Sequence, residues 1–254
     1  MKAAVRLTRL CIGGCILLLC SLGSAASAQT LRIVTEAWPP LIKVNDGVSG
    51  GLIWEMTSAV LAQMDVEVTL EFVPWRRALY LVERGQRDAV LAAGRSPERD
   101  AVMRFPNEPL LLSETVIFSR ADHPVQFEGV ESLNGMTVGL SAGYSYSREI
   151  SEASGFERIA APNVAAGLEL LMRGRVDAFI VNREVGWYEA RQRGIASQLA
   201  TSDQPVSGGP VYLAFALDVP QSFVDEFDNA LRAYHQTTGY RLMMGQYEAL
   251  FFFF

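Results

Sequence analysis

The segment Ser96-Pro97-Glu98-Arg99 directly follows a buried apolar stretch and has the composition of a helix start. Serine caps a helix, proline suits its first position and glutamate suits its first turn. A strand that runs into a helix N-terminus leaves free N–H groups that attract an anion, and Arg99 can add a bidentate grip on a carboxylate. The spacing of these residues alone is equally consistent with an ordinary capped helix that carries a surface arginine.

Two other polar segments follow predicted strands in the same way. Gly143-Tyr144-Ser145-Tyr146 precedes a predicted helix, and it is not a phosphate loop because no Gly-Lys-Ser/Thr follows. Asn182-Arg183-Glu184 follows a later strand and faces the same predicted edge of the sheet. Each also has a simpler interpretation. The first segment can be a glycine turn with surface tyrosines, and the second a helix cap with flanking surface charges.

Aromatic and charged residues also follow the first two predicted strands. Glu36 and Trp38 come just after the first, and Trp75 and Arg77 just after the second. The aromatic rings can form a wall of a cleft or simply pack in the core, and for Trp38 alone core packing is the commoner role.

The sequence predicts no catalytic residue, metal site or cofactor. His123 and His235 lie far apart and have no partners at metal-ligand spacing. No pair of acidic residues stands out for acid–base chemistry.

The elements that position these residues alternate between strand and helix. Val66 to Phe72 alternates strictly between apolar and polar residues, which is typical of a half-buried strand. The β-α-β-α-β order favours a mainly parallel sheet with helices on its faces. The predicted elements of this first unit are strand 31–35, a helix after Gly50-Gly51, strand 66–72, helix 75–83 and strand 88–92.

A second unit of similar build follows, with strands at 137–140 and 177–181, and helices at 145–153, after the cap residue Asn163, and at 183–193. Two apolar extended runs, 114–119 and 211–217, connect the units, and a loop is expected at 205–210. A last helix then carries Phe223, Phe227, Leu231 and Tyr234 on one face. If both runs are crossovers, residues 29–118 and 216–254 form one lobe and 119–215 the other, with a ligand cleft between them.

The N-terminus has the three parts of a secretory signal peptide. Lys2, Arg6 and Arg9 precede an apolar run, and Ala26-Ser27-Ala28 supplies the cleavage site, so cleavage is expected after Ala28. A membrane anchor is the main alternative, but the run is shorter than the about 20 apolar residues of a spanning helix. A lipoprotein is a second alternative, because Ile12-Gly13-Gly14-Cys15 loosely resembles a lipobox.

Cleavage would also change the composition of the chain. All three cysteines precede Ala28, so the mature protein can form no disulfide and has no cysteine nucleophile. Removing three positive charges takes the net charge from −6 to −9, which argues against nucleic acid as a partner. The apolar content of 50% argues against disorder. The closing run Phe251–Phe254 has no assigned role.

From about Leu31 to Tyr247 the chain resembles the family 3 extracellular solute-binding proteins, the type associated with amino-acid uptake by ABC transporters. The resemblance implies an α/β, two-lobed type II periplasmic binding fold with a double-strand hinge. The marks that carry it are Pro39-Pro40, Trp75, Gly85 to Asp88, Ser96 to Arg99, Gly135 with Val138-Gly139, and Gly174 to Ala178.

The resemblance also implies roles for single residues. Arg99 and Ser96 match the pair that grips a ligand carboxylate, and Tyr144-Ser145 matches the helix start that closes on it from the other lobe. Trp38 matches an aromatic residue that covers the ligand, with Glu36 nearby. Where many amino-acid binders hold the ligand ammonium with an aspartate, this chain has Asn182, whose neutral amide cannot offset that charge. Glu184, two residues on, is the alternative acid.

We therefore predict a monomeric periplasmic protein that captures a small carboxylate-bearing solute and delivers it to an ABC permease. The main alternative is an enzyme resembling periplasmic cyclohexadienyl dehydratases, with Glu184 or Glu36 as the proton donor. A third is a ligand-sensing protein that acts through a separate signalling partner. The signal peptide excludes a cytoplasmic regulator.

Overall fold

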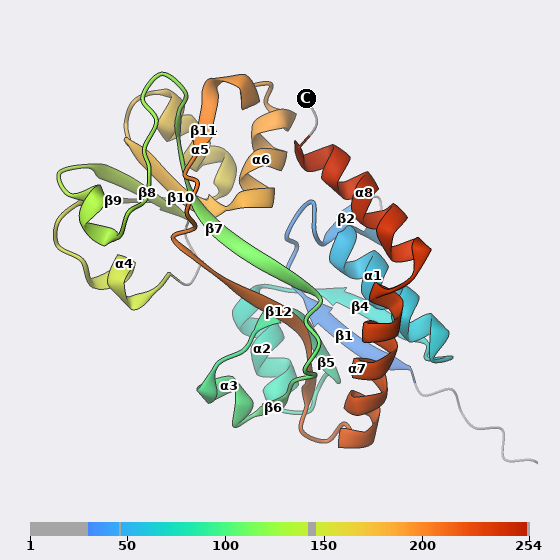
Figure 1. The fold of residues 1–254 in the computed structure, drawn as a ribbon. Coiled ribbons are helices and arrows are strands. Elements are labelled where there is room, and N and C mark those ends of the chain that lie inside the picture. Colours follow the sequence, from blue (N-terminus) through green and yellow to red (C-terminus); the bar gives the residue numbers. More distant parts are fainter. Residues whose placement is uncertain (1–29, 46, 142–145, 253–254) are drawn as a thin grey trace, which may run out of the picture.

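The computed structural model describes residues 30–45, 47–141 and 146–252, with side chains up to Tyr247. Two long strands, β7 (Leu111–Arg120) and β12 (Ser207–Ala216), run between two lobes (Figure 1). They pair antiparallel, with Ser207 opposite Thr115 and Val211 opposite Leu111. Both lie inside one continuous sheet of order β4-β1-β5-β12-β7-β10-β8-β9. The two apolar runs expected to connect the lobes are therefore this strand pair.

Lobe 1 has the β-α-β-α-β order that the sequence predicts. Its strands β1 (Leu31–Thr35), β4 (Val68–Phe72) and β5 (Ala89–Gly94) are parallel, with β1 in the middle. Apolar residues of α1 (Leu52–Gln63) and α7 (Gln221–His235) cover one face of this sheet, and α2 (Trp75–Glu83) covers the other. The last helices of the chain thus pack on its first helix.

Smaller elements complete lobe 1. The single turn α3 (Pro97–Asp100) precedes the short strand β6 (Met103–Arg104). A hairpin of β2 (Lys43–Asn45) and β3 (Val48–Gly50), which the sequence did not predict, leads into α1. At the N-cap of α1, Gly51 has φ 103°, and a Cβ there would lie 2.6 Å from the carbonyl oxygen of Leu41. Only glycine fits this approach of two backbone segments.

Lobe 2 contains a second group of parallel strands of this sheet, with helices on both faces. Strand β8 (Thr137–Ser141) lies between β9 (Glu157–Ala161) and β10 (Ala178–Asn182), and β10 pairs antiparallel with β7. The remaining elements are strand β11 (Leu199–Thr201), helices α4 (Arg148–Glu152), α5 (Val164–Met172) and α6 (Arg183–Gln192), and the 3-10 turns η1 (Val130–Leu133) and η2 (Ala196–Gln198).

Other details also differ from the sequence prediction. The predicted loop 205–210 is wrong from Ser207 on, because these residues pair with β7 and lengthen β12. Strand β9 was not predicted. The predicted helix start at Ser145 lies outside the described residues, and α4 begins at Arg148 with Ser147 as its cap. The predicted lobe boundaries at 118/119 and 215/216 fall within β7 and β12 and stay predictions.

The C-terminal helix α8 (Thr238–Phe252) links the two lobes outside the sheet. It packs on α1 and α7 in lobe 1 and also contacts α6 of lobe 2 (Figure 1). Tyr247 is buried, and its hydroxyl donates to Glu55 Oε1 at 2.8 Å. Among the helices in the described ranges, none is long and apolar enough to cross a bilayer.

Close packing of α5 on β10 leads to a stability prediction. Gly167 is buried in α5, and a Cβ there would lie 2.2 Å from Cζ of Phe179, which is fully buried. Because the ring has no free space to move into, we expect Gly167→Ala to lower the free energy of unfolding by about 1–3 kcal/mol despite the better helix propensity of alanine. Denaturant unfolding measures this.

Gly245→Ala in α8 is the matched control, since no heavy atom lies within 4 Å of its Cβ position. It should leave the protein unchanged or more stable by up to about 1 kcal/mol. Equal effects of the two substitutions would contradict the packing argument.

Candidate functional site

The predicted site residues of lobe 1 meet at one edge of its sheet. Glu36 and Trp38 follow β1, Trp75 follows β4, and Ser96 and Arg99 follow β5. Since the three strands are parallel neighbours, their carboxyl ends share an edge, the usual place for a ligand in an open α/β sheet. The fold thus brings together residues that lie about 60 positions apart in the chain.

Arg99 is the partly buried cation at this edge. Its Nη1 donates to the carbonyl oxygen of Gly94 at 2.6 Å, and its guanidinium lies 5.9 Å from the centre of the Trp75 ring. The adjacent Asp100 pairs with Arg95 instead. Within the described ranges, no carboxylate forms an ion pair with Arg99, so its remaining N–H groups can bind an anion. Ser96 caps α3 as predicted, and its hydroxyl accepts from the backbone N–H of Arg99 at 3.4 Å.

The other predicted residues of lobe 1 differ in exposure. Trp38 closes a turn through its backbone with Ile42, and its half-buried ring packs against the lobe core. Glu36 is exposed. Arg77 is exposed in the first turn of α2, with its guanidinium 5.6 Å from the Tyr80 ring. The Trp38 ring thus packs against the core, its role as a cleft wall stays a prediction, and Glu36 and Arg77 are exposed.

Asn182 lies at the carboxyl end of β10 and is 1% exposed. Its Nδ2 donates to Ser113 Oγ and to the carbonyl oxygen of Glu114, both at 3.1 Å. Its Oδ1 accepts from the backbone N–H of Val185 at 3.0 Å and so caps α6. The amide therefore ties α6 and β10 to the hinge strand β7. Its assignment to the ligand stays a prediction.

The neighbouring strand β8 ends at Ser141, which the sequence analysis did not single out. Its side chain is 3% exposed, and its Oγ has no hydrogen-bond partner. Tyr146 closes this end of the sheet, because its hydroxyl accepts from the N–H of Ser141 and donates to the carbonyl oxygen of Ile180. The predicted Tyr144 and Ser145 lie outside the described residues. A small polar residue as the last residue of a strand was the signal that could have identified Ser141.

Glu184 lies in the first turn of α6, next to an ion pair. Arg183 Nε donates to Glu114 Oε2 at 2.9 Å across the hinge, while Glu184 Oε2 is buried without a hydrogen-bond partner. Burial raises the pKa of the Glu184 carboxyl, and the nearby Glu114 adds to this, while hydrogen bonds from its own backbone and from Asn182, and the charge of Arg183, oppose it. Glu184 thus holds a proton to a higher pH than an ordinary glutamate.

A surface pocket also lies at the opposite edge of lobe 2. Its lining includes Arg120, Asp122, His123 and Asp177. Arg120 pairs with Asp122, and Asp177 accepts from the N–H of Thr137, so these charges are already compensated within the protein. None of the predicted site residues lines it. Within the described ranges, no group of three His, Cys, Asp or Glu residues could hold a metal ion.

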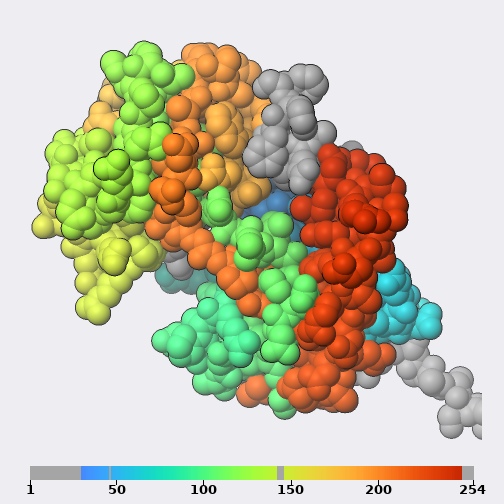
Figure 2. Space-filling view, viewed as in Figure 1, coloured from blue at the N-terminus to red at the C-terminus, as the bar shows by residue number. Residues whose placement is uncertain are grey.

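The two polar edges belong to different lobes on either side of the β7–β12 strand pair. The molecular surface shows a recess between the α3 end of lobe 1 and the α4 end of lobe 2 (Figure 2). Two α/β lobes joined by two crossing strands have the architecture of the type II periplasmic binding proteins, as predicted. The chain belongs to the bacterial extracellular solute-binding proteins of family 3, which match residues 31–247.

Solved structures share this fold at low sequence identity. An ancestral arginine-binding protein bound to arginine is 20% identical, with a TM-score of 0.70 over 86% of this chain and 97% of that one. The ligand-binding core of GluR0 in complex with L-glutamate is 17% identical, with a TM-score of 0.73 over 87% and 99%. The ancestral amino-acid-binding protein AncCDT-1, a precursor of cyclohexadienyl dehydratase, is 20% identical, with a TM-score of 0.70 over 86% and 95%.

Proposed function

We propose that this protein captures a small carboxylate-bearing solute, an amino acid or a related compound, between its two lobes. Closure about β7 and β12 would bring the carboxyl ends of the two sheets together around the solute. A ligand that contacts both lobes favours the closed arrangement by the free energy of those contacts. The solute-bound protein would then deliver its cargo to an ABC permease of the inner membrane, acting as a periplasmic monomer after cleavage of residues 1–28.

Arg99 is the observation that carries this proposal. Most arginines of the described ranges donate to a carboxylate or to several backbone carbonyls, whereas Arg99 is partly buried and gives one hydrogen bond, to Gly94. A guanidinium with unused N–H groups favours a planar anion that accepts two parallel hydrogen bonds, and a carboxylate is such an anion. The Trp75 ring, whose centre lies 5.9 Å from the guanidinium, makes a cation–π contact with it.

A thermal-shift screen of the protein against amino acids and other small carboxylates tests the proposal. A solute present at 100 times its dissociation constant adds about 2.7 kcal/mol to the free energy of unfolding. For a chain of this size that corresponds to a rise in Tm of about 5–10 °C. If no small carboxylate raises Tm while the protein is folded, solute capture is the wrong function.

A second candidate is an enzyme of the same fold that eliminates water from a carboxylate substrate in this cleft. Glu184 favours it, because its raised pKa lets it keep a proton and give it to a departing hydroxyl group. Glu36, the other residue considered, is exposed. Incubation with prephenate or arogenate separates the two functions: product formation supports the enzyme, and binding without turnover supports capture.

A further inference from the structure

Helix α2 carries a row of arginines on its outer face. Its buried apolar residues pack on strands β1, β5 and β12. Arg76, Tyr80 and Arg84 follow one another at four-residue steps, and Arg77 lies beside this line, so these side chains share the opposite face of the helix. All of them are exposed, and Tyr80 is 44% exposed. We call them the α2 arginine stripe, which is about 12 Å long at the rise of a helix.

The arginines of the stripe have no acidic partner within the described ranges. Arg77 and Arg84 instead contact the aromatic ring between them, since each guanidinium lies 5.6 Å from the centre of the Tyr80 ring. Glu83, the acidic residue of α2, is exposed and is not within ion-pair distance of them in the described part of the chain. An exposed arginine such as Arg148 in lobe 2 pairs with a glutamate one turn away. The stripe therefore leaves its positive charge uncompensated.

Helix stability does not account for the stripe. The free N–H groups at a helix N-terminus carry partial positive charge, so acidic residues are favoured in the first turn and cations are unfavourable there. Helix α2 nevertheless begins with Trp75-Arg76-Arg77 and has no acidic residue in its first turn, and its N-cap Pro74 makes no side-chain hydrogen bond. Residues that oppose the stability of their own element are typical of a functional surface.

The composition of the stripe fits a protein-binding surface. Tyrosine and arginine are enriched among the residues that contribute most of the binding energy at protein interfaces. A guanidinium without an acidic partner binds a carboxylate best, through two parallel hydrogen bonds. Because the whole chain has a net charge of −6, the stripe is a local exception to the charge of the protein, and it favours an acidic partner.

An anionic membrane matches the stripe less well than an acidic protein does. Sequences that bind anionic lipids carry clusters of about 4–8 basic residues, whereas the stripe has three, and a membrane surface would repel the rest of this acidic chain. Carboxylates on two turns of a helix are spread over about 11 Å, which is close to the length of the stripe.

We propose that the α2 arginine stripe binds an acidic segment of a protein partner. The carboxylates of that segment pair with the three guanidinium groups, and an apolar side chain packs on the Tyr80 ring. This role goes beyond solute capture and does not depend on it. It assigns Arg77, which the sequence analysis placed with the ligand, to the partner instead.

Fluorescence anisotropy with two labelled helical peptides tests the proposal. One peptide carries glutamates at positions i, i+4 and i+8 with a leucine on the same face, and the other has glutamines at those positions. We expect the protein to bind the glutamate peptide at least tenfold tighter than the glutamine peptide at low ionic strength. The difference should shrink at about 1 M salt, because exposed ion pairs are screened.

Substitutions in the stripe should remove this preference. The triple variant Arg76→Gln, Arg77→Gln, Arg84→Gln should bind both peptides equally, and Tyr80→Ala should weaken the glutamate peptide by about fivefold. Because these side chains are exposed, Tm should change by no more than about 3 °C. If the triple variant does not fold, the three single substitutions and Tyr80→Ala decide the question.

Lobe 2 offers a control of matched charge. The triple variant Arg148→Gln, Arg173→Gln, Arg193→Gln removes the same number of positive charges from arginines that are each paired with a glutamate on their own helix. It should bind the glutamate peptide within about threefold of the wild-type protein. An equal loss in both triple variants would mean that only net charge matters, and the proposal would be wrong.

Three further outcomes would also overturn the proposal. The first is that the wild-type protein does not distinguish the two peptides. The second is that it binds neither peptide but binds vesicles of equal parts phosphatidylcholine and phosphatidylglycerol through the stripe, which would make the partner a membrane. The third is a dimer in sedimentation velocity that the stripe variant abolishes, which would make the partner a second copy of this chain.

Discussion

Arg99→Ala should weaken solute binding at least 100-fold while the protein stays folded. Truncating one partner of a buried charge pair costs about 2–5 kcal/mol in binding, and 1.4 kcal/mol is a factor of ten. The substitution removes the single described hydrogen bond to Gly94 and the contact with Trp75, so the free energy of unfolding should fall by about 1 kcal/mol or less.

The control and the graded variant make this test specific. Arg76→Ala removes an exposed arginine from the same lobe and should leave affinity within about twofold. Arg99→Lys keeps the positive charge but loses the planar guanidinium group with its parallel N–H donors, so this variant should bind the solute with intermediate affinity. Calorimetry with the best solute from the screen measures all three. Wild-type affinity in Arg99→Ala would remove the basis of the proposed function.

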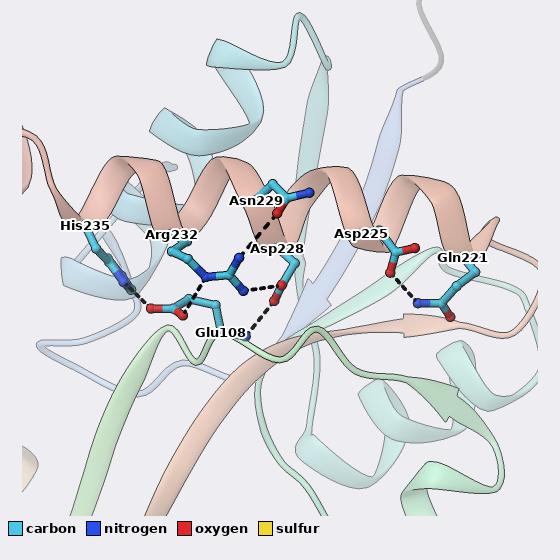
Figure 3. Close-up of polar contacts among 7 residues, drawn as sticks. All are labelled: Glu108, Gln221, Asp225, Asp228, Asn229, Arg232 and His235. Carbon is cyan, nitrogen blue, oxygen red and sulfur yellow. Dashed lines mark hydrogen bonds and ion pairs between the residues drawn. The ribbon is translucent and has the colours of Figure 1, made fainter.

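The second large effect is on stability, and it comes from a polar cluster that joins α7 to the segment before β7 (Figure 3). Asp228 is 6% exposed and accepts from the backbone N–H of Glu108 at 2.6 Å and from Arg232 Nη2 at 2.7 Å. His235 Nδ1 lies 2.9 Å from Glu108 Oε1, so both acids of the cluster have partners.

Asp228→Ala should lower the free energy of unfolding by about 3 kcal/mol. It leaves the Glu108 N–H without its acceptor and opens a small cavity, while Arg232 keeps Asn229 and Glu108 as partners. The loss of a buried hydrogen-bond acceptor is among the more destabilising effects of a substitution. Arg232 is half exposed and can regain water, which keeps the value below that of a fully buried pair. Asp228→Asn retains an oxygen acceptor for the Glu108 N–H and should cost less.

Asp225 offers the matched control on the same helix. It is exposed, and its side-chain hydrogen bond within the described part of the chain is to Gln221, one turn away (Figure 3). Asp225→Ala should therefore change stability by less than about 0.5 kcal/mol. Urea unfolding of the three variants measures these differences in free energy, with the same dependence on urea concentration used for all three. A value for Asp228→Ala equal to that for Asp225→Ala would show that the cluster is not a stabilising link.

Much of the fold follows from short-range patterns. Helix α2 spans Trp75–Glu83 as predicted, and Asn163 and Ser96 cap the helices expected of them. These features depend on residues three or four positions apart, and the local sequence contains all of them. The apolar runs likewise predicted β7 and β12, because a strand buried on both faces reads as continuous apolar sequence.

The missed elements depend on pairing with distant segments. Ser207 to Pro210 contains two glycines and a proline, which are typical of a loop, yet it forms strand because β7 lies opposite it, about 100 residues away in sequence. Strand β9 extends beside β8 in the same way. In such segments, pairing with a distant strand overrides the secondary structure that the local sequence favours.

The sequence by itself determined the order of most elements and the position of Arg99 at a strand end, since these follow from local spacing and residue type. The class of protein came from the resemblance to a known family. Only the tertiary structure decided which side chains keep unused hydrogen-bonding capacity. Asn182 bonds Ser113, 69 positions away, whereas the atoms Glu184 Oε2 and Ser141 Oγ are buried and have no hydrogen-bond partner in the described ranges. Hydrogen-bond satisfaction is a property of the packed assembly of strands, so the same motif can bind a ligand or hold the fold together.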